Sequence, residues 1–236
     1  MLSIECPVDT DKIMEKSAQF NSLKCIQSAF LLFCFPFFLS AQSPLKSFSK
    51  LSSPEKRWVI AHPFIAEKAF VITQRARIVT DSLSKNGILK DGNGGQLDAF
   101  RHAYWMALLV QKIPERKALK LGKAHEKGNY LEWKKGMLED SMRADSMLCV
   151  MDLENNSTGI KAGKKFSQDT IHQKSLEAVI LENVKSGKMV IIKKNAFGQP
   201  EDRSGRIIVA DQYKGKWYLP KVLVHSDYKE PLPLNK

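Results

Sequence analysis

The chain has 236 residues, of which 26% are charged, and its formal net charge is +12 at pH 7. This length supports one domain with a full hydrophobic core, or one domain with a small appendage. The sequence contains no internal repeat and no low-complexity tract, which argues against a repeat architecture. The positive charge favours anionic partners, namely an anionic substrate, an envelope component or nucleic acid, although solvated surface lysines explain it equally well.

The first 41 residues have the organisation of a secretory signal peptide. Residues 29–39 (AFLLFCFPFFL) carry no charge, lysines precede them, and small residues follow. The run is short and contains a proline, which argues against a membrane-spanning helix. After removal of the signal peptide we expect no stable membrane span. We place cleavage after Ala41, with Met14 as a possible true start, and expect a periplasmic or secreted protein. A buried helix is the alternative.

Helical patterns dominate the next part of the chain, and prolines and glycines separate them. Two helices are predicted to start at prolines, which are favoured at the first helical position. A glycine-rich turn segment follows at 86–95. One predicted helix begins at Pro54, and a second runs from Pro63 to about Leu83. Further helices are predicted at 96–112, 114–128, 139–163 and 168–186.

After Gly187 the sequence changes to short runs rich in β-branched and aromatic residues: KMVIIKK, RIIVADQY and KWYLPKVLVH. Such runs between turn residues are typical of strands. The predicted fold class is therefore mainly α, a helical bundle-like domain with a small β-containing C-terminal appendage. Its divisions are a signal peptide (1–41), a linker (42–53), a helical domain (54–187) and a β-rich segment (188–236). Nothing in the last segment indicates chemistry.

The predicted helix 96–112 is apolar nearly all round, which is typical of a buried helix. Three ionisable residues interrupt it near its start, Asp98, Arg101 and His102. At 100° per residue they lie within about 100° of one another. Buried Asp and Arg are rare unless paired, so this polar arc must face partners, which could be other protein groups, a metal ion or a substrate.

Two other segments offer such partners. In the helix 114–128, His125 lies opposite a basic stripe and is predicted to point inward, with Glu126 nearer the boundary. The basic stripe consists of Arg116, Lys120, Lys123 and Lys127. In MDLENNSTG, Asp152, Asn155, Asn156 and Gly159 share one helical face. Paired asparagines have poor helix propensity, which indicates a role beyond local stability.

Together these segments place eight polar residues on inward faces: Asp98, Arg101, His102, His125, Glu126, Asp152, Asn155 and Asn156. Imidazoles and carboxylates that project inward from separate helices are the material of a metal site in a helical bundle. No zinc motif is matched literally. A metal-free buried network, with Arg101 paired to Asp98 or Asp152, is the other interpretation of the pattern.

The motifs DAFRHAYW, AHE and MDLxNNxxG occur here in this order, at 98–105, 124–126 and 151–159. In this the chain resembles an uncharacterised bacterial family, a domain of unknown function found on exported and toxin-like proteins. The resemblance covers about 62–160, and Met106 and Lys161 depart from the family pattern. It implies that the eight polar residues are shared positions, and it implies no activity.

We therefore expect an exported domain that is a divalent-metal-dependent hydrolase, acting on a phosphoester. His102, His125 and Asp152 are the predicted ligands of a zinc-like ion, and Asp98 is a further ligand or orients one. Glu126 is predicted to be the general base, Arg101 to stabilise developing negative charge, and Asn155 and Asn156 to position substrate. The alternatives are a non-catalytic binding module with a metal-free polar network, and a metal-free His/Glu acid–base enzyme.

Overall fold

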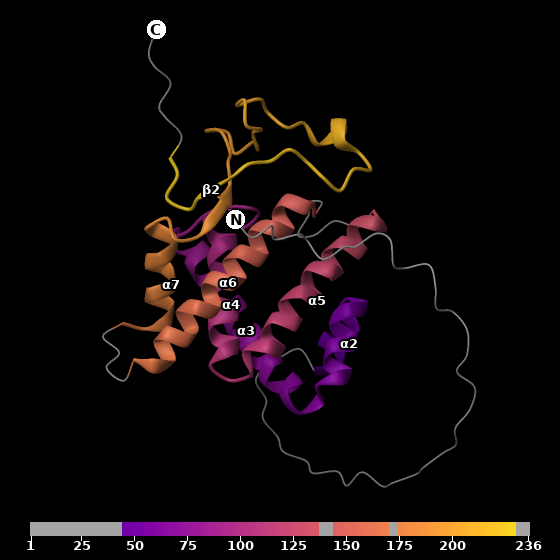
Figure 1. Cartoon of the computed structure of the whole chain (residues 1–236), viewed down its shortest axis with the longest axis vertical. Coiled ribbons are helices and arrows are strands. Elements are labelled where there is room, and N and C mark those ends of the chain that lie inside the picture. Colours follow the sequence, from indigo (N-terminus) through magenta and orange to yellow (C-terminus); the bar gives the residue numbers. More distant parts are fainter. Residues whose placement is uncertain (1–43, 137–143, 170–173, 230–236) are drawn as a thin grey trace, which may run out of the picture. The chain divides into compact units, whose positions relative to one another are not determined.

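The computed structural model describes residues 44–136, 144–169 and 174–229. Over these residues the chain is mainly helical, with a small antiparallel sheet near the C-terminus, which confirms the predicted fold class (Figure 1). The helices are α1 (Pro44–Lys50), α2 (Ser53–Ala61), α3 (Pro63–Lys85), α4 (Gln96–Val110), α5 (Glu115–Lys134), α6 (Ser146–Gln168) and α7 (Leu176–Lys185). The strands are β1 (Val190–Ile192) and β2 (Leu223–His225).

Helix α1 belongs to a unit separate from the one that contains α2 to α7. It lies in the segment that we expected to be a linker. The predicted signal peptide lies outside the described residues. No helix in the described part of the chain has both the length and the apolar character needed to cross a membrane.

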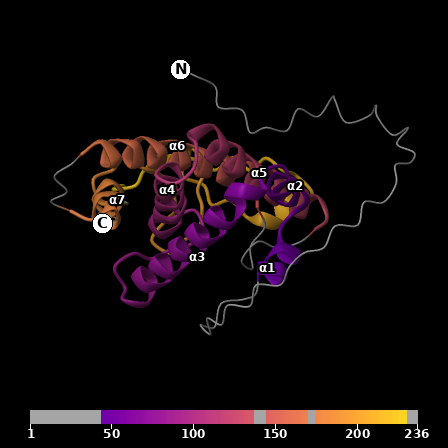
Figure 2. The same ribbon diagram turned by 90° about the horizontal axis from the view of Figure 1, so that it is seen from below.

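Helix α4 is the central element of the domain, and Figure 2 shows it between α3 and α6. One apolar cluster joins α4 to α3, α6, α7 and β1, with Phe100 fully buried. A second cluster joins the other side of α4 to α2, α3 and α5, around Met106 and Leu109. Burial on both sides explains why the sequence of α4 is apolar nearly all round.

Helices α4 and α6 approach each other closely because α6 carries glycines at the crossing. A side chain at Gly159 would overlap the backbone of Ala103, and one at Gly163 would overlap the backbone of Ala107. The two pairs are spaced four residues apart on both helices, so they follow one contact line. The polar residues of α6 lie nearer to its start than these glycines. The close packing of the two helices holds them against the polar arc of α4.

The C-terminal segment packs on the helices through backbone and side-chain bonds. Strand β1 pairs antiparallel with β2, and the amide of Ile192 also donates to the carbonyl of Gly94, 2.7 Å away. Asn155 on α6 bonds both backbone groups of Val190, donating over 2.9 Å and accepting over 3.0 Å. Met189 and Ile192 are buried in the main core, so this segment completes the helical core.

Several predicted boundaries were wrong. Helix α5 continues through Gly128 to Lys134, because that glycine is buried against Ser52, which comes just before α2. Helix α6 begins at Ser146, not at 139, because the side chain of Asp145 accepts hydrogen bonds from the amides of Met147 and Leu148 and caps it. It also runs to Gln168, and Ser175 caps a shorter α7.

The run RIIVADQY does not form the strand that we expected. Ile207 makes only an isolated bridge with Glu201, and residues Ala210–Tyr213 form one turn of 3-10 helix. Ile207 and Val209 are exposed, so within the described structure neither finds a buried face to pack against. A β-branched composition therefore did not suffice where the chain offers no neighbouring strand.

Candidate functional site

Asp98 lies in the first turn of α4, and both of its carboxylate oxygens accept hydrogen bonds. Its Oδ2 accepts from the amide of Gly94 at 2.6 Å, and its Oδ1 accepts from the guanidinium of Arg101 at 2.6 Å. Burial raises the pKa of Asp98, against the opposing effects of the Arg101 charge and the Gly94 amide. Arg101 itself is about one third exposed (31%), so it lies at the edge of the site.

His102 lies one turn further along α4, with its imidazole between two carboxylates. Its Nε2 is 3.6 Å from Oδ1 of Asp98 and 3.4 Å from Oδ1 of Asp152 on α6. All three side chains are buried. Burial lowers the pKa of His102 well below its usual value, and the nearby charges of Arg101 and His125 lower it further. The imidazole is therefore neutral, the form in which histidine binds metals.

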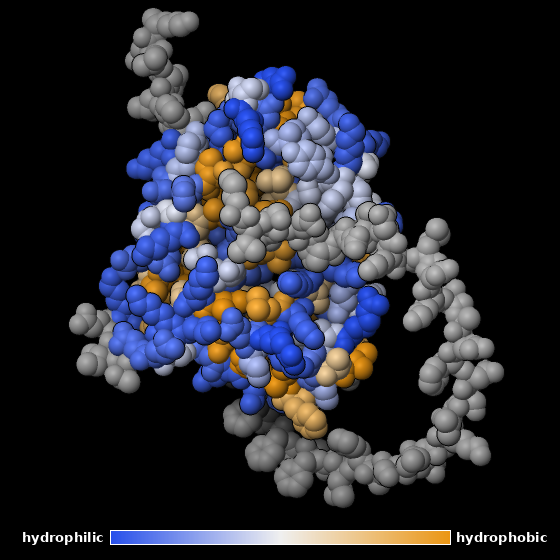
Figure 3. Space-filling view, in the orientation of Figure 1, coloured by the Kyte–Doolittle hydropathy of each residue, from blue (hydrophilic) through white to orange (hydrophobic). Residues whose placement is uncertain are grey.

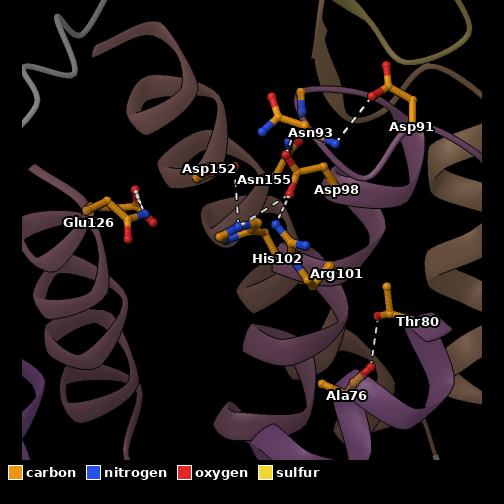
Figure 4. A network of polar contacts seen from close by, with 12 residues as sticks. Ala76, Thr80, Asp91, Asn93, Asp98, Arg101, His102, Glu126, Asp152 and Asn155 are labelled. Atoms are coloured by element: carbon orange, nitrogen blue, oxygen red, sulfur yellow. Dashed lines mark hydrogen bonds and ion pairs between the residues drawn. The ribbon is translucent and has the colours of Figure 1, made fainter. Parts of the chain in front are cut away.

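His125 and Glu126 approach His102 from α5 (Figure 4 shows Glu126 on the facing helix). The rings of His102 and His125 have their centres 6.0 Å apart, and Trp105 meets His125 edge-on. Glu126 is buried, which corrects the prediction that it lies near the boundary, whereas His125 is only partly buried. Both residues thus face α4, as the helical pattern predicted.

Glu55 on α2 orients His125. Its Oε1 lies 3.0 Å from Nδ1 of His125, and its Oε2 accepts from the backbone amide and hydroxyl of Ser52. Burial favours a higher pKa for Glu55, but the hydrogen bond and charge of His125 and the bonds from Ser52 outweigh it and lower the pKa to about 2. Glu55 is therefore ionised at neutral pH, next to the imidazole.

We did not predict a role for Glu55 from the sequence. A signal existed, because Ser52 and Glu55 have the S-x-x-E spacing of a capping box, and the structure has both of its bonds. The capping box fixes the carboxylate at the start of α2, and the buried Gly128 allows this end of α2 to pack on α5. The spacing reveals the cap, but the contact with His125 is a tertiary one.

The ionisable side chains form two overlapping groups in which the possible ligand atoms lie within 4.8 Å of one another. One group is Asp98, His102 and Asp152, and the other is His102, His125 and Glu126. We predicted a single metal site built from Asp98, His102, His125 and Asp152. The structure instead divides these residues between two groups, and His102 belongs to both. Each group has three residues of the types that bind divalent cations.

Two buried side chains of this region, His102 and Asn156, have polar atoms that make no hydrogen bond of good geometry in the described structure. The atoms are Nδ1 of His102 and both the oxygen and nitrogen of the Asn156 amide. The Asn156 amide nonetheless interacts with His102 and raises the pKa of that imidazole, against the larger effect of burial. The Asn156 amide lies against Gly122 on α5, so it faces the space between α5 and α6. Buried polar groups are normally satisfied, which makes these atoms candidates for contact with a ligand or water.

Asn155 is placed differently from the prediction. Its amide bonds β1 at Val190 and anchors the strand, so its geometry does not support a role in positioning substrate. The remaining histidines of the described chain lie outside the two ionisable groups. His62 bonds the carbonyl of Trp58 and the amine of Lys117, and His225 is exposed. The four residues of the basic stripe on α5 are exposed, as predicted.

Comparison with known proteins gives one match. No curated protein and no solved structure matches the chain. A family model described as a domain of unknown function, DUF6973, matches residues 56–188. This range includes α4, α5 and α6 with every residue of the two ionisable groups, and it starts directly after Glu55. Because the match covers more than half of the chain, the protein belongs to the DUF6973 family.

Proposed function

We propose that the protein is a divalent-metal-dependent hydrolase of phosphoesters, with His102, Asp98 and Asp152 as the ligands of the ion. The observation that carries this proposal is the spacing around Nε2 of His102. Its distances to the two Oδ1 atoms, 3.4 and 3.6 Å, are longer than a good hydrogen bond of about 2.9 Å. Ligands bound tetrahedrally at about 2.0–2.1 Å lie about 3.3–3.4 Å apart, close to these separations.

The chemistry of the surrounding residues fits the same assignment. A divalent cation would act as a Lewis acid on a phosphoryl oxygen and lower the pKa of water. Arg101, bonded to Asp98 and partly exposed, would contact the phosphate and stabilise its developing negative charge. Asn156 would hydrogen-bond the substrate or water, since its buried amide lies beside His102 and makes no hydrogen bond of good geometry with the described residues.

The residues of α5 would handle protons. Glu126 belongs with His102 to the group that does not contain the two aspartates, and it would accept a proton from the attacking water. His125, oriented by the ionised Glu55, would donate a proton to the leaving group. This assignment moves His125 from the predicted ligand set to acid–base chemistry, because its carboxylate partner Glu55 orients it as in a catalytic dyad.

The test compares matched variants from the two groups. We expect purified full-length wild type to bind a divalent metal and to hydrolyse bis(p-nitrophenyl) phosphate, with both properties lost in Asp152→Asn. Glu126→Gln should keep the metal and lose at least about a hundredfold in turnover. Glu115→Gln, at an exposed carboxylate on the same helix α5, is the control and should change neither. Melting temperatures verify that the variants fold.

The outcomes separate the assignments. Loss of metal in Glu126→Gln but not in Asp152→Asn would move the ion to the group of His102, His125 and Glu126. A wild type that neither binds metal nor hydrolyses the ester would contradict the proposal.

A metal-free polar network is the second candidate, and one observation favours it. Arg101 pairs with Asp98 at 2.6 Å, the pairing expected of a network that only stabilises the fold. In a binding module of this kind, wild type contains no metal after purification in metal-supplemented buffer, and Arg101→Ala lowers the melting temperature. A metal-free acid–base enzyme built on the Glu55–His125 pair differs from both, because its activity survives chelation.

Export to the periplasm or medium also belongs to this proposal. It rests on the charge-free run at 29–39 and the small residues after it. Intact-mass measurement of the protein from its own host should give a chain that begins near Gln42. An uncleaved chain in the cytoplasm would contradict export.

A further inference from the structure

The outer side of α3 carries a row of exposed apolar side chains. Phe64, Val71 and Ile78 follow one another at intervals of seven residues, with 94%, 60% and 69% of their surface exposed. Ile60, at the end of α2, is 70% exposed and precedes the turn between the two helices. Apolar surface is visible where α2 meets α3, at the lower edge of the molecule in Figure 3. We call Phe64, Val71 and Ile78 the α3 row.

Two positively charged residues lie on the same face of α3 as the α3 row. Lys68 and Arg75 follow Phe64 and Val71 by four residues each, and both are exposed, although Arg75 also hydrogen-bonds Tyr104 on α4. On a helical wheel all five residues lie within about 80° of one another. The nearest acidic residues of the helix, Glu67 and Asp81, lie to one side of this arc. Apolar and positively charged side chains therefore alternate along one line of the helix surface.

The row is separate from the face that α3 uses for folding. The buried face consists of Ala69, Ile72, Ala76, Thr80 and Leu83, and it contacts α4 and the second core cluster. Its centre is about a third of a turn away from the α3 row. No packing requirement in the described structure therefore accounts for three large apolar residues on the outside, and exposed apolar surface of this kind marks interaction sites.

We propose that the α3 row docks the protein onto a lipid surface with anionic head groups. Exposed apolar residues of a helix enter the boundary between head groups and acyl chains, while neighbouring lysines and arginines contact lipid phosphates. Phe64, Lys68 and Val71 match that arrangement. The row is a single convex line on one helix, which suits a fluid surface better than a shaped protein partner. The net charge of +12 favours the same occupant.

A residue-resolved measurement separates this row from any other part of the chain that contacts lipid. Phe64→Trp places a reporter in the row, and Leu119→Trp places a matched reporter at an exposed apolar residue of α5, beside the basic stripe. Each full-length variant is mixed with phosphatidylcholine–phosphatidylglycerol vesicles whose acyl chains carry bromine. Emission is compared with that of wild type, which contributes the four native tryptophans.

We expect bromine to quench the added emission of Phe64→Trp but not that of Leu119→Trp. Equal quenching of the two reporters, or none in Phe64→Trp, would overturn the proposal. A reporter at 64 that is already shielded without vesicles and is unaffected by them would show that protein covers the row, from a second copy or another segment of this chain. That result would also overturn it.

The cations give a second, independent readout. In the Phe64→Trp background, Lys68→Glu should raise the lipid concentration needed for half-maximal quenching by about fivefold or more, at about fivefold for each cation lost. Salt should raise it in the parent as well, and pure phosphatidylcholine vesicles should produce little quenching. Quenching that is indifferent to charge and salt would overturn the proposed role of anionic head groups. The hydrolase proposal is unaffected by either result, because no residue of the row belongs to the site.

Discussion

Asn155 and Asn156 are neighbours on α6 and have the same side chain, yet the structure uses them in opposite ways. The amide of Asn155 bonds both backbone groups of Val190 and ties β1 to the helix. The amide of Asn156 is equally buried but makes no hydrogen bond of good geometry in the described structure, and it lies beside His102 of the ionisable cluster, whose pKa it raises slightly against burial. A satisfied buried amide stabilises a fold, whereas an unsatisfied one lowers its stability and indicates a site.

The same contrast extends along α6. Toward its C-terminal half, Gly159 and Gly163 fit the backbone of α4 and serve packing alone. Toward its start, Asp152 and Asn156 face the polar arc and the space next to α5. The candidate site and the helix crossing therefore occupy successive turns of α6, and substitutions in the two regions should have different consequences.

The largest loss of stability should come from the helix crossing. Gly159→Ala places a methyl group against the carbonyl of Ala103, and the backbone on both sides cannot yield easily. We expect a loss of about 3 kcal/mol or more in the free energy of unfolding, measured by urea denaturation. Gly136→Ala, a glycine with no atom near its missing side chain, is the comparison, although its positive φ adds some strain. A mild effect at Gly159 would mean that the helices can separate.

Asn155→Ala should be the next most destabilising change. It leaves the partly buried amide and carbonyl of Val190 without the side chain that bonds both, at a cost of about 2–4 kcal/mol in unfolding free energy. Asn156→Ala, one residue away, should change that free energy by less than about 1 kcal/mol, because its amide makes no hydrogen bond of good geometry and has the smallest of the effects on the pKa of His102. It should instead lower phosphodiester turnover. If both variants lose stability equally, the distinction between the two asparagines is wrong.

The Glu55–His125 pair predicts a pH-dependent contribution to stability. The pKa of Glu55 is lowered to about 2 from 4.5, so its contribution is fully present above about pH 4.5 and is lost as the pH falls toward 2. Glu55→Gln should therefore be less stable than wild type by about 2 kcal/mol at pH 6. The difference should shrink between pH 4.5 and 2 in parallel denaturation curves. A difference that does not depend on pH would assign the effect to the helix cap alone.

The smallest effect on stability should come from the α3 row. Val71→Ser and Ile78→Ser remove exposed side chains that pack against nothing in the described core. We expect changes within about 0.5 kcal/mol in unfolding free energy. A larger loss would show that the row is covered in the folded protein, which calorimetry of each variant measures directly.

Periodicity predicted the polar arc of α4 and the inward faces of α5 and α6, because a helix fixes the direction of each side chain from its sequence position alone. The two roles that it missed depend on contacts across long stretches of chain. Asn155 meets Val190, 35 residues later, and Glu55 meets His125, 70 residues later. The helical pattern also could not show that His102 would belong to two groups of ionisable residues. The position of His102 relative to α6 depends on how closely the glycines of α6 approach α4.

The central claim is that His102 and two aspartates hold a metal ion, and X-ray absorption at the edge of the bound metal tests it most directly. The spectrum of the full-length protein should fit one imidazole nitrogen and carboxylate oxygens at about 2.0–2.2 Å for a zinc-like ion. Asp152→Asn, which should lose the metal, should give no such spectrum, and His125→Ala should leave the single imidazole in place. Two imidazoles in the wild-type shell, one of them lost in His125→Ala, would contradict the assignment, as would the absence of any bound metal.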